Sequence, residues 1–95
     1  MKAQGILNTL RKNKSMFFGK YPLKSMSLFG SYARSEETKE SDIDIMVEFS
    51  SPVGFEFIDL AIELEQILNQ KVDLISKKGV KADMLPYIEK DLIYV

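Results

Sequence analysis

Asp42 and Asp44 are the residues of this sequence best placed to do chemistry. They begin a stretch, 42–49, in which polar and apolar residues alternate, and a period of two predicts a β-strand. Residues i and i+2 of a strand point to the same face, about 6.6 Å apart along the chain. Two carboxylates at that spacing repel each other unless a divalent cation lies between them. The pair therefore indicates a metal site, whereas an isolated Asp-X-Asp would more often be two exposed residues at the start of a strand.

Gly30 and Ser31 could bind an anion near these aspartates. They follow a short run, 24–29, that is typical of a buried strand. A strand that ends in Gly-Ser and turns directly into a helix presents free backbone N–H groups and a hydroxyl group, which suit a phosphate. Glycine also lets the backbone approach a ligand without a Cβ clash. Alone, a Gly-Ser pair is more often a plain turn.

Asp73 is a third candidate carboxylate. It lies between two apolar residues of another short strand, 71–76, and so faces away from them. If this strand neighbours 42–49, Asp73 joins the face of Asp42 and Asp44. Three converging carboxylates could hold one or two Mg²⁺ ions, and two such ions clamp both oxygens of a phosphoryl displacement. Otherwise Asp73 is an exposed strand residue.

The composition excludes most other kinds of catalytic site. The chain has 95 residues, with 13 Lys or Arg, 14 Asp or Glu, and no Cys or His. It therefore has no disulfide, no ordinary zinc site, no thiol nucleophile and no His-based triad. Any metal must be held by oxygen ligands, which favours Mg²⁺, Mn²⁺ or Ca²⁺. We expect a cytoplasmic protein with no membrane segment, because there is no cysteine and no long apolar run.

The net charge of −1 conceals an asymmetry along the chain. Residues 1–35 contain seven basic groups and no acid, whereas all 14 acids lie in residues 36–95. A solvated basic helix beside an acidic remainder is the ordinary interpretation. Binding of RNA through this segment is a minor hypothesis, because no aromatic-rich platform for single strands accompanies it.

The pattern of apolar residues predicts one domain, 1–95, with an α/β (α+β) fold: a small mixed sheet of three to four strands with helices packed on it. The expected core face of 42–49 consists of Ile43, Ile45, Val47 and Phe49. On the expected helix 55–69 the apolar face consists of Phe57, Ala61, Leu64 and Leu68, with Ile58 and Ile67 beside it. Before the first strand we expect a helix over 3–18 that ends near Gly19. Between the first two strands we expect a helical turn at 31–35 and an exposed loop at 36–41. Later in the chain, Ser51-Pro52 indicates a helix start, and we expect a helix within 80–90 that begins or kinks near Pro86. The last four residues, 92–95, could be a strand or a helix end.

These residues together resemble the signature of the polymerase-beta-type nucleotidyltransferase superfamily. Gly30-Ser31 followed after ten residues by Asp42-Ile43-Asp44 has the spacing of its motif. The fuller stretch 29–34, Phe-Gly-Ser-Tyr-Ala-Arg, resembles the minimal nucleotidyltransferase branch, and the likeness runs from about residue 24 to residue 76. One departure is Ser35, where the family often has Gly.

The resemblance implies a role for each motif residue. Gly30 and Ser31 would hold the triphosphate of ATP, and Asp42 and Asp44 would ligate Mg²⁺. Asp73 would be a third metal ligand or the general base for the attacking hydroxyl. The family arginine corresponds to Arg34, which would brace the motif or touch phosphate.

Family membership also implies a partner and an acceptor. The minimal branch resembles the antitoxin half of a two-component system whose toxin is a HEPN-domain ribonuclease. By that likeness this chain would transfer AMP from ATP to a hydroxyl, and tyrosine is the expected acceptor, on the toxin.

Two alternatives stay open at this point. The first is an antitoxin that acts by binding alone, using the apolar end 92–95 or the basic first helix. The second is an oligomeric nucleotidyltransferase for small molecules, with exposed Phe17, Phe18 and Tyr21 at the subunit interface. These three aromatic residues could equally cover the core.

Overall fold

A four-stranded sheet in the order β3-β2-β1-β4 organises the computed structural model, which describes all 95 residues. β1 (Leu23–Phe29) runs antiparallel to β2 (Ile43–Phe49) and to β4 (Ile93–Tyr94), whereas β3 (Val72–Ser76) runs parallel to β2. The predicted small mixed sheet is confirmed, and the undecided last residues form its edge strand β4.

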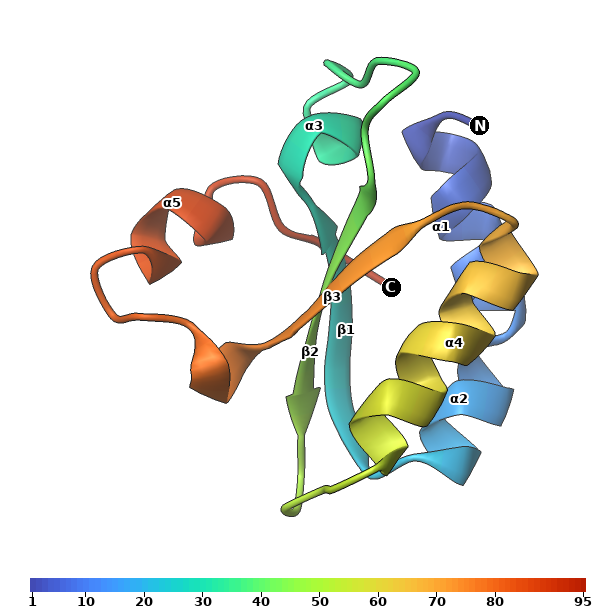
Figure 1. The fold of residues 1–95 in the computed structure, drawn as a ribbon, viewed down its shortest axis with the longest axis vertical. Helices are drawn as coiled ribbons and strands as arrows, with labels where there is room; N and C mark the ends of the chain where they lie inside the picture. Colours follow the sequence, from blue (N-terminus) through green and yellow to red (C-terminus); the bar gives the residue numbers. More distant parts are fainter.

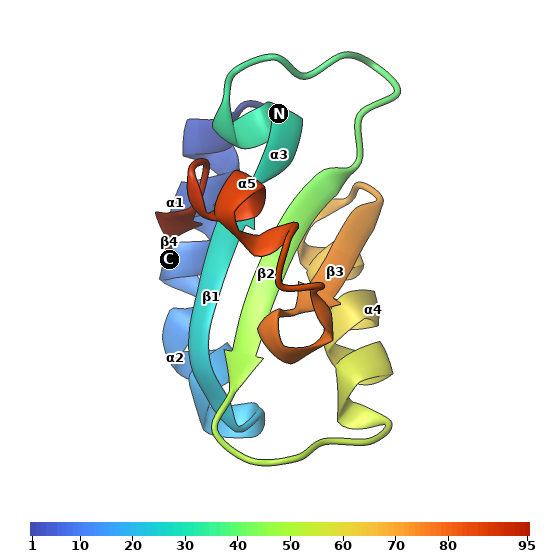
Figure 2. The ribbon, with the colours of Figure 1, turned by 90° about the vertical axis from the view of Figure 1, so that its left-hand side faces the viewer.

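Helices lie on both faces of the sheet but differ in size (Figures 1 and 2). The long helices cover one face: α1 (Ala3–Lys12), α2 (Lys14–Lys20) and α4 (Glu56–Leu68). Short elements lie on or beside the other face: α3 (Gly30–Ala33), the 3-10 turn η1 (Lys77–Gly79) and α5 (Leu85–Glu89). No helix is both long enough and apolar enough to cross a membrane.

The hydrophobic core lies between the sheet and the long helices. Ile43, Ile45 and Val47 of β2 are fully buried, as the alternation of this strand predicts. From α4 the buried residues are Leu60, Leu64 and Leu68, which recur every four residues and so line one side of the helix. Leu60 was not in the predicted apolar face. Ile58, expected beside that face, is 55% exposed, because two residues of a helix turn it about 200° away from Leu60.

The first helix was predicted as one element, and this is wrong. α1 ends at Lys12, and a second helix, α2, runs from Lys14 through Gly19 to Lys20. Asn13 causes the break, because its side-chain amide donates to the carbonyl oxygen of Thr9 at 2.8 Å and competes with helical bonding.

The predicted helix start at Ser51-Pro52 is also wrong, since α4 begins at Glu56. The chain needs the intervening residues to cross from the sheet layer to the helix layer. At the end of β2, Ser50 is instead tied back by a backbone hydrogen bond of 2.8 Å to Pro22.

Aromatic residues around α2 belong to the core. Phe17 is fully buried, Tyr21 is 4% exposed, and Phe18 is partly buried against the same cluster. The suggested oligomer interface built from these three side chains is therefore contradicted.

Leu64→Ala should lower the free energy of unfolding by about 2–5 kcal/mol, because it leaves a cavity between α4 and the sheet. Urea denaturation measures the change. Ile58→Ala, on the exposed side of the same helix, is the control and should change stability by less than about 0.5 kcal/mol. Equal losses for the two variants would contradict the described packing.

Candidate active site

Strand register brings Asp44 and Asp73 together. In the parallel pair β2–β3, Asp44 lies directly opposite Asp73, while on its other side it faces Phe29 of β1. Both carboxylates point away from the core, because their strand neighbours pack against it. The condition stated for Asp73, that strand 71–76 neighbours 42–49, is confirmed.

Gly30 occupies a position that only glycine fits. Its φ of +74° lies in the left-handed region, and a Cβ at this position would lie 2.1 Å from Oδ2 and 3.1 Å from Cβ of Asp44. The absence of a side chain thus allows the backbone of Gly30, at the start of the β1–α3 turn, to lie against the carboxylate. This close approach joins the predicted anion site to the predicted metal site.

Asp44 is partly buried in an acidic environment. The pKa of Asp44 is raised to about 6, first by burial and then by the charge of Asp73, a hydrogen bond with Asp73 and the charge of Asp42, while Arg34 opposes the rise. A divalent cation would relieve this repulsion, and carboxylate oxygens are the ligands that Mg²⁺ prefers. The donor set therefore fits Mg²⁺.

The three aspartates differ in how firmly they are placed. Asp44 lies within β2, whereas Asp42 is exposed and precedes the strand, and Asp73 is exposed on β3. No group of three or more Asp, Glu, His or Cys side chains is arranged as a ready metal cluster. The structure thus places Asp44 and Asp73 side by side, with Asp42 just before the strand. Metal binding by all three stays a prediction.

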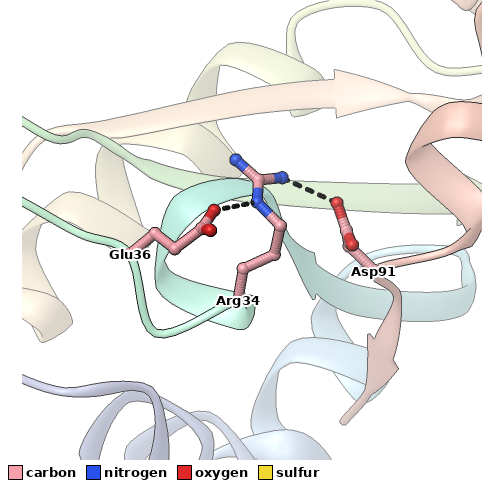
Figure 3. Close-up of polar contacts among 3 residues, drawn as sticks. All are labelled: Arg34, Glu36 and Asp91. Carbon is pink, nitrogen blue, oxygen red and sulfur yellow. Dashed lines mark hydrogen bonds and ion pairs between the residues drawn. The ribbon is translucent and has the colours of Figure 1, made fainter.

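Arg34 braces the turn in this structure (Figure 3). Its Nε donates to Glu36 at 2.7 Å and its NH1 donates to Asp91 at 2.7 Å. Both bonds raise the pKa of Arg34. The pair with Asp91 ties α3 to the segment that leads into β4. Sequence reasoning missed Asp91, because nothing in the sequence indicates a contact across 57 positions.

Ser35 adopts the conformation that glycine would supply. Its φ is +58°, so the turn after Arg34 keeps the left-handed backbone although the residue has a Cβ. The departure from the usual family residue therefore leaves the path of this loop intact.

A cavity of about 570 Å³ lies elsewhere on the sheet. Its walls come from the ends of β2 and β3, the loop after β2, η1 and α5. Its nearest β2 residue on the Asp44 face is Glu48, about 13 Å away along the strand. No predicted site residue lines it.

Asp44→Asn should stabilise the metal-free protein near pH 7.5. The native pKa of Asp44 is raised above its unfolded value, so the native state binds more protons between about pH 4 and pH 6 and wild-type stability falls across that window as the pH rises. The full shift would correspond to about 3 kcal/mol, which solvent screening reduces to about 1–2 kcal/mol. Urea denaturation of both proteins at pH 7.5 and pH 4 should show this gain at pH 7.5 and almost none at pH 4. A gain that is independent of pH would refute the assignment.

Gly30→Ala should destabilise the protein by about 1–3 kcal/mol, because alanine is strained at positive φ and its Cβ displaces the Asp44 carboxylate. The matched control is Gly19→Ala, within α2, where a Cβ meets nothing within 4 Å and helix propensity favours alanine. Thermal unfolding should move in opposite directions for the two variants.

Comparison with known proteins agrees with this geometry. The family model described as "Nucleotidyltransferase domain" matches residues 8–95. A protein of Methanocaldococcus jannaschii, named provisionally as a protein adenylyltransferase, is 53% identical, and the match covers 95% of this chain and 94% of that protein. Protein adenylyltransferase MntA of Thermococcus cleftensis is 33% identical over 97% of this chain and 91% of its own length.

Solved structures share the fold. One that is provisionally described as a minimal nucleotidyltransferase has a TM-score of 0.84 and 24% identity, covering 100% of this chain and 97% of that chain. A toxin–antitoxin crystal structure with AMP-PNP has a TM-score of 0.71 and 24% identity, over 99% of this chain and 72% of that chain. A tri-AMPylated Shewanella oneidensis HEPN toxin in complex with an MNT antitoxin gives a TM-score of 0.70 and 22% identity, over 94% of this chain and 70% of that chain. The family match and the relatives lead to one conclusion: this chain is a nucleotidyltransferase and belongs to the nucleotidyltransferase domain family.

Proposed function

We propose that the protein transfers AMP from ATP, with Mg²⁺, to a tyrosine hydroxyl of a HEPN-domain ribonuclease toxin and so acts as its antitoxin. The observation that carries this proposal is the Asp44–Asp73 pair lying against the Gly30 turn. Names of relatives as protein adenylyltransferases and the AMPylated HEPN toxin in a structural neighbour support it.

The side chains divide the work of the transfer. Gly30 and Ser31 would orient the triphosphate, and Asp42 and Asp44 would hold Mg²⁺, which when bound would supply positive charge to balance the phosphates. The acceptor oxygen attacks the α-phosphorus, a P–O bond to that oxygen forms, and the bond to pyrophosphate breaks. Asp73, opposite Asp44, accepts the proton of the hydroxyl. Nucleotidyl transfer needs positioning and charge neutralisation rather than a protein nucleophile, so a chain without His or Cys can do it.

The acceptor is proposed to come from another protein because the aspartates lie outside the two hollows whose walls are described. Asp42, Asp44 and Asp73 are absent from the walls of the 570 Å³ cavity and of a second hollow of about 350 Å³ beside α4. An edge of sheet without a pocket suits a side chain presented by a partner better than a small molecule that must be enclosed. The burial of Phe17 and Tyr21 further weighs against a small-molecule enzyme assembled through those residues.

Label from α-³²P-ATP should appear on the co-purified toxin when wild-type protein and Mg²⁺ are present. Asp44→Asn should reduce the rate at least about 100-fold, because electrostatic stabilisation of the transferring group is lost. Asp83→Asn, an exposed acid before α5, is the matched control and should keep the wild-type rate. If the toxin stays unlabelled yet is bound and inhibited equally by wild type and Asp44→Asn, the protein is instead an antitoxin that acts by binding alone.

A further inference from the structure

A line of exposed apolar side chains runs along α4 and its N-cap residue. The helix lies on the face of the sheet that carries the core (Figure 1), whereas Asp44 and Asp73 point to the other face. Phe55 is 82% exposed, Ile58 55% and Ile62 49%. Spacings of three and four residues place these side chains on one side of the helix. We call them the α4 stripe. Large apolar side chains that are contiguous and exposed mark a contact surface rather than a solvated face.

A hollow of about 350 Å³ opens beside the stripe, between the end of α2 and the first turns of α4. Its walls are Lys20, Tyr21, Glu56, Asp59, Ile62 and Glu63, so Ile62 belongs to both the stripe and the hollow. Three carboxylates against one ammonium group make the hollow acidic. We call it the acidic hollow.

Two oxygen atoms in its walls are buried without a hydrogen-bond partner: the hydroxyl of Tyr21 and Oε2 of Glu63. Tyr21 as a whole is only 4% exposed. The other carboxylate oxygen of Glu63 is paired with Lys20, whose ammonium lies 5.8 Å from the centre of the Tyr21 ring. The Tyr21 hydroxyl can donate to the Glu63 carboxylate beside it, so the acids of the hollow that lack a cation are Glu56 and Asp59, which are exposed and form no ion pair.

We propose that the α4 stripe and the acidic hollow bind a segment of the toxin partner that carries an arginine flanked by apolar side chains. The apolar side chains cover Phe55 and Ile58, and the guanidinium enters the hollow. Five donors in a planar group can pair with the exposed carboxylates of Glu56 and Asp59 in the walls of the hollow. That the partner is the toxin rests on the proposed function, whereas the binding surface itself rests on the exposed side chains and the lining of the hollow.

A second copy of this chain fits the surface poorly. Both arginines of the sequence are already engaged: Arg11 with the carbonyl of Tyr94, and Arg34 with Glu36 and Asp91. A symmetric contact through the stripe would also bring two acidic hollows together, which like-charge repulsion disfavours. Nucleic acid and anionic lipid are repelled for the same reason.

Docking on α4 leaves the aspartates free. α4 lies on one face of the sheet (Figures 1 and 2). Asp44 and Asp73 point to the other face, because their strand neighbours pack into the core, so a partner docked on α4 does not cover the site. Loss of docking should therefore raise the KM for the partner and leave kcat almost unchanged.

Isothermal titration calorimetry with the purified toxin tests the surface directly. Ile58→Ser and Asp59→Lys should each weaken binding at least about tenfold, as expected of central contacts. Met84→Ser and Asp83→Lys make matched changes at exposed positions on the α5 side and should change binding less than about twofold. Equal weakening by all four variants, or no measurable binding of wild type, would overturn the proposal.

Label transfer in the same samples distinguishes the two proposals. Labelled toxin with unchanged binding of the Ile58→Ser and Asp59→Lys variants would refute the docking surface and leave the enzyme activity in place. Unlabelled toxin whose binding depends on the stripe would refute AMP transfer and support the surface. Self-association of the free protein that Ile58→Ser abolishes would make a second copy the occupant and overturn the proposal.

Discussion

The antiparallel register of β1 and β2, which sets Phe29 opposite Asp44, determines where every part of the site lies. Because β1 ends at that pair, the next residue must turn directly over the carboxylate, and only glycine at positive φ leaves room for it. Parallel pairing with β3 then adds Asp73 on the other side. The β1–α3 turn and the two carboxylates are thus consequences of one backbone arrangement. A slip of one residue would turn Asp44 into the core.

This arrangement costs stability, and the opposite face of the same strand offsets the cost. Burial and neighbouring carboxylates raise the pKa of Asp44, so its ionised form destabilises the native state near neutral pH. Ile43 and Ile45, on either side of it, are fully buried against the helices. Their burial fixes the strand that carries the charge, and a rigid strand holds an unfavourable group more accurately than a loop could. Asp42, just before the strand, lacks this support and is exposed.

Local pattern was enough to predict the strands and the motif, and it failed where distant parts of the chain decide. Alternation in 42–49 predicted both the buried face and the placement of Asp44, because it depends only on the period of a strand. The break at Asn13 depends on one side-chain hydrogen bond, and the late start of α4 depends on the width of the layer that the chain must cross. The contact of Arg34 with Asp91 joins segments far apart in the sequence, so no local pattern could predict it.

Folding also brings basic residues of the first 35 positions into contact with acidic residues from the rest of the chain. Four of the five ion pairs join a basic residue of the first 35 positions to an acid from the rest of the chain: Lys20–Glu63, Lys24–Glu48, Arg34–Glu36 and Arg34–Asp91. These pairs engage Lys20, Lys24 and Arg34, whereas Arg11 and Lys14 donate to the backbone carbonyl oxygens of Tyr94 and Val95. The start of α4 keeps an excess of negative charge, because the only cation beside Glu56 and Asp59 is Lys20, which is already paired with Glu63. A surface that keeps this excess beside exposed apolar side chains is suited to a basic protein partner, and the Asp44–Asp73 pair on the far side of the sheet is left open for the acceptor.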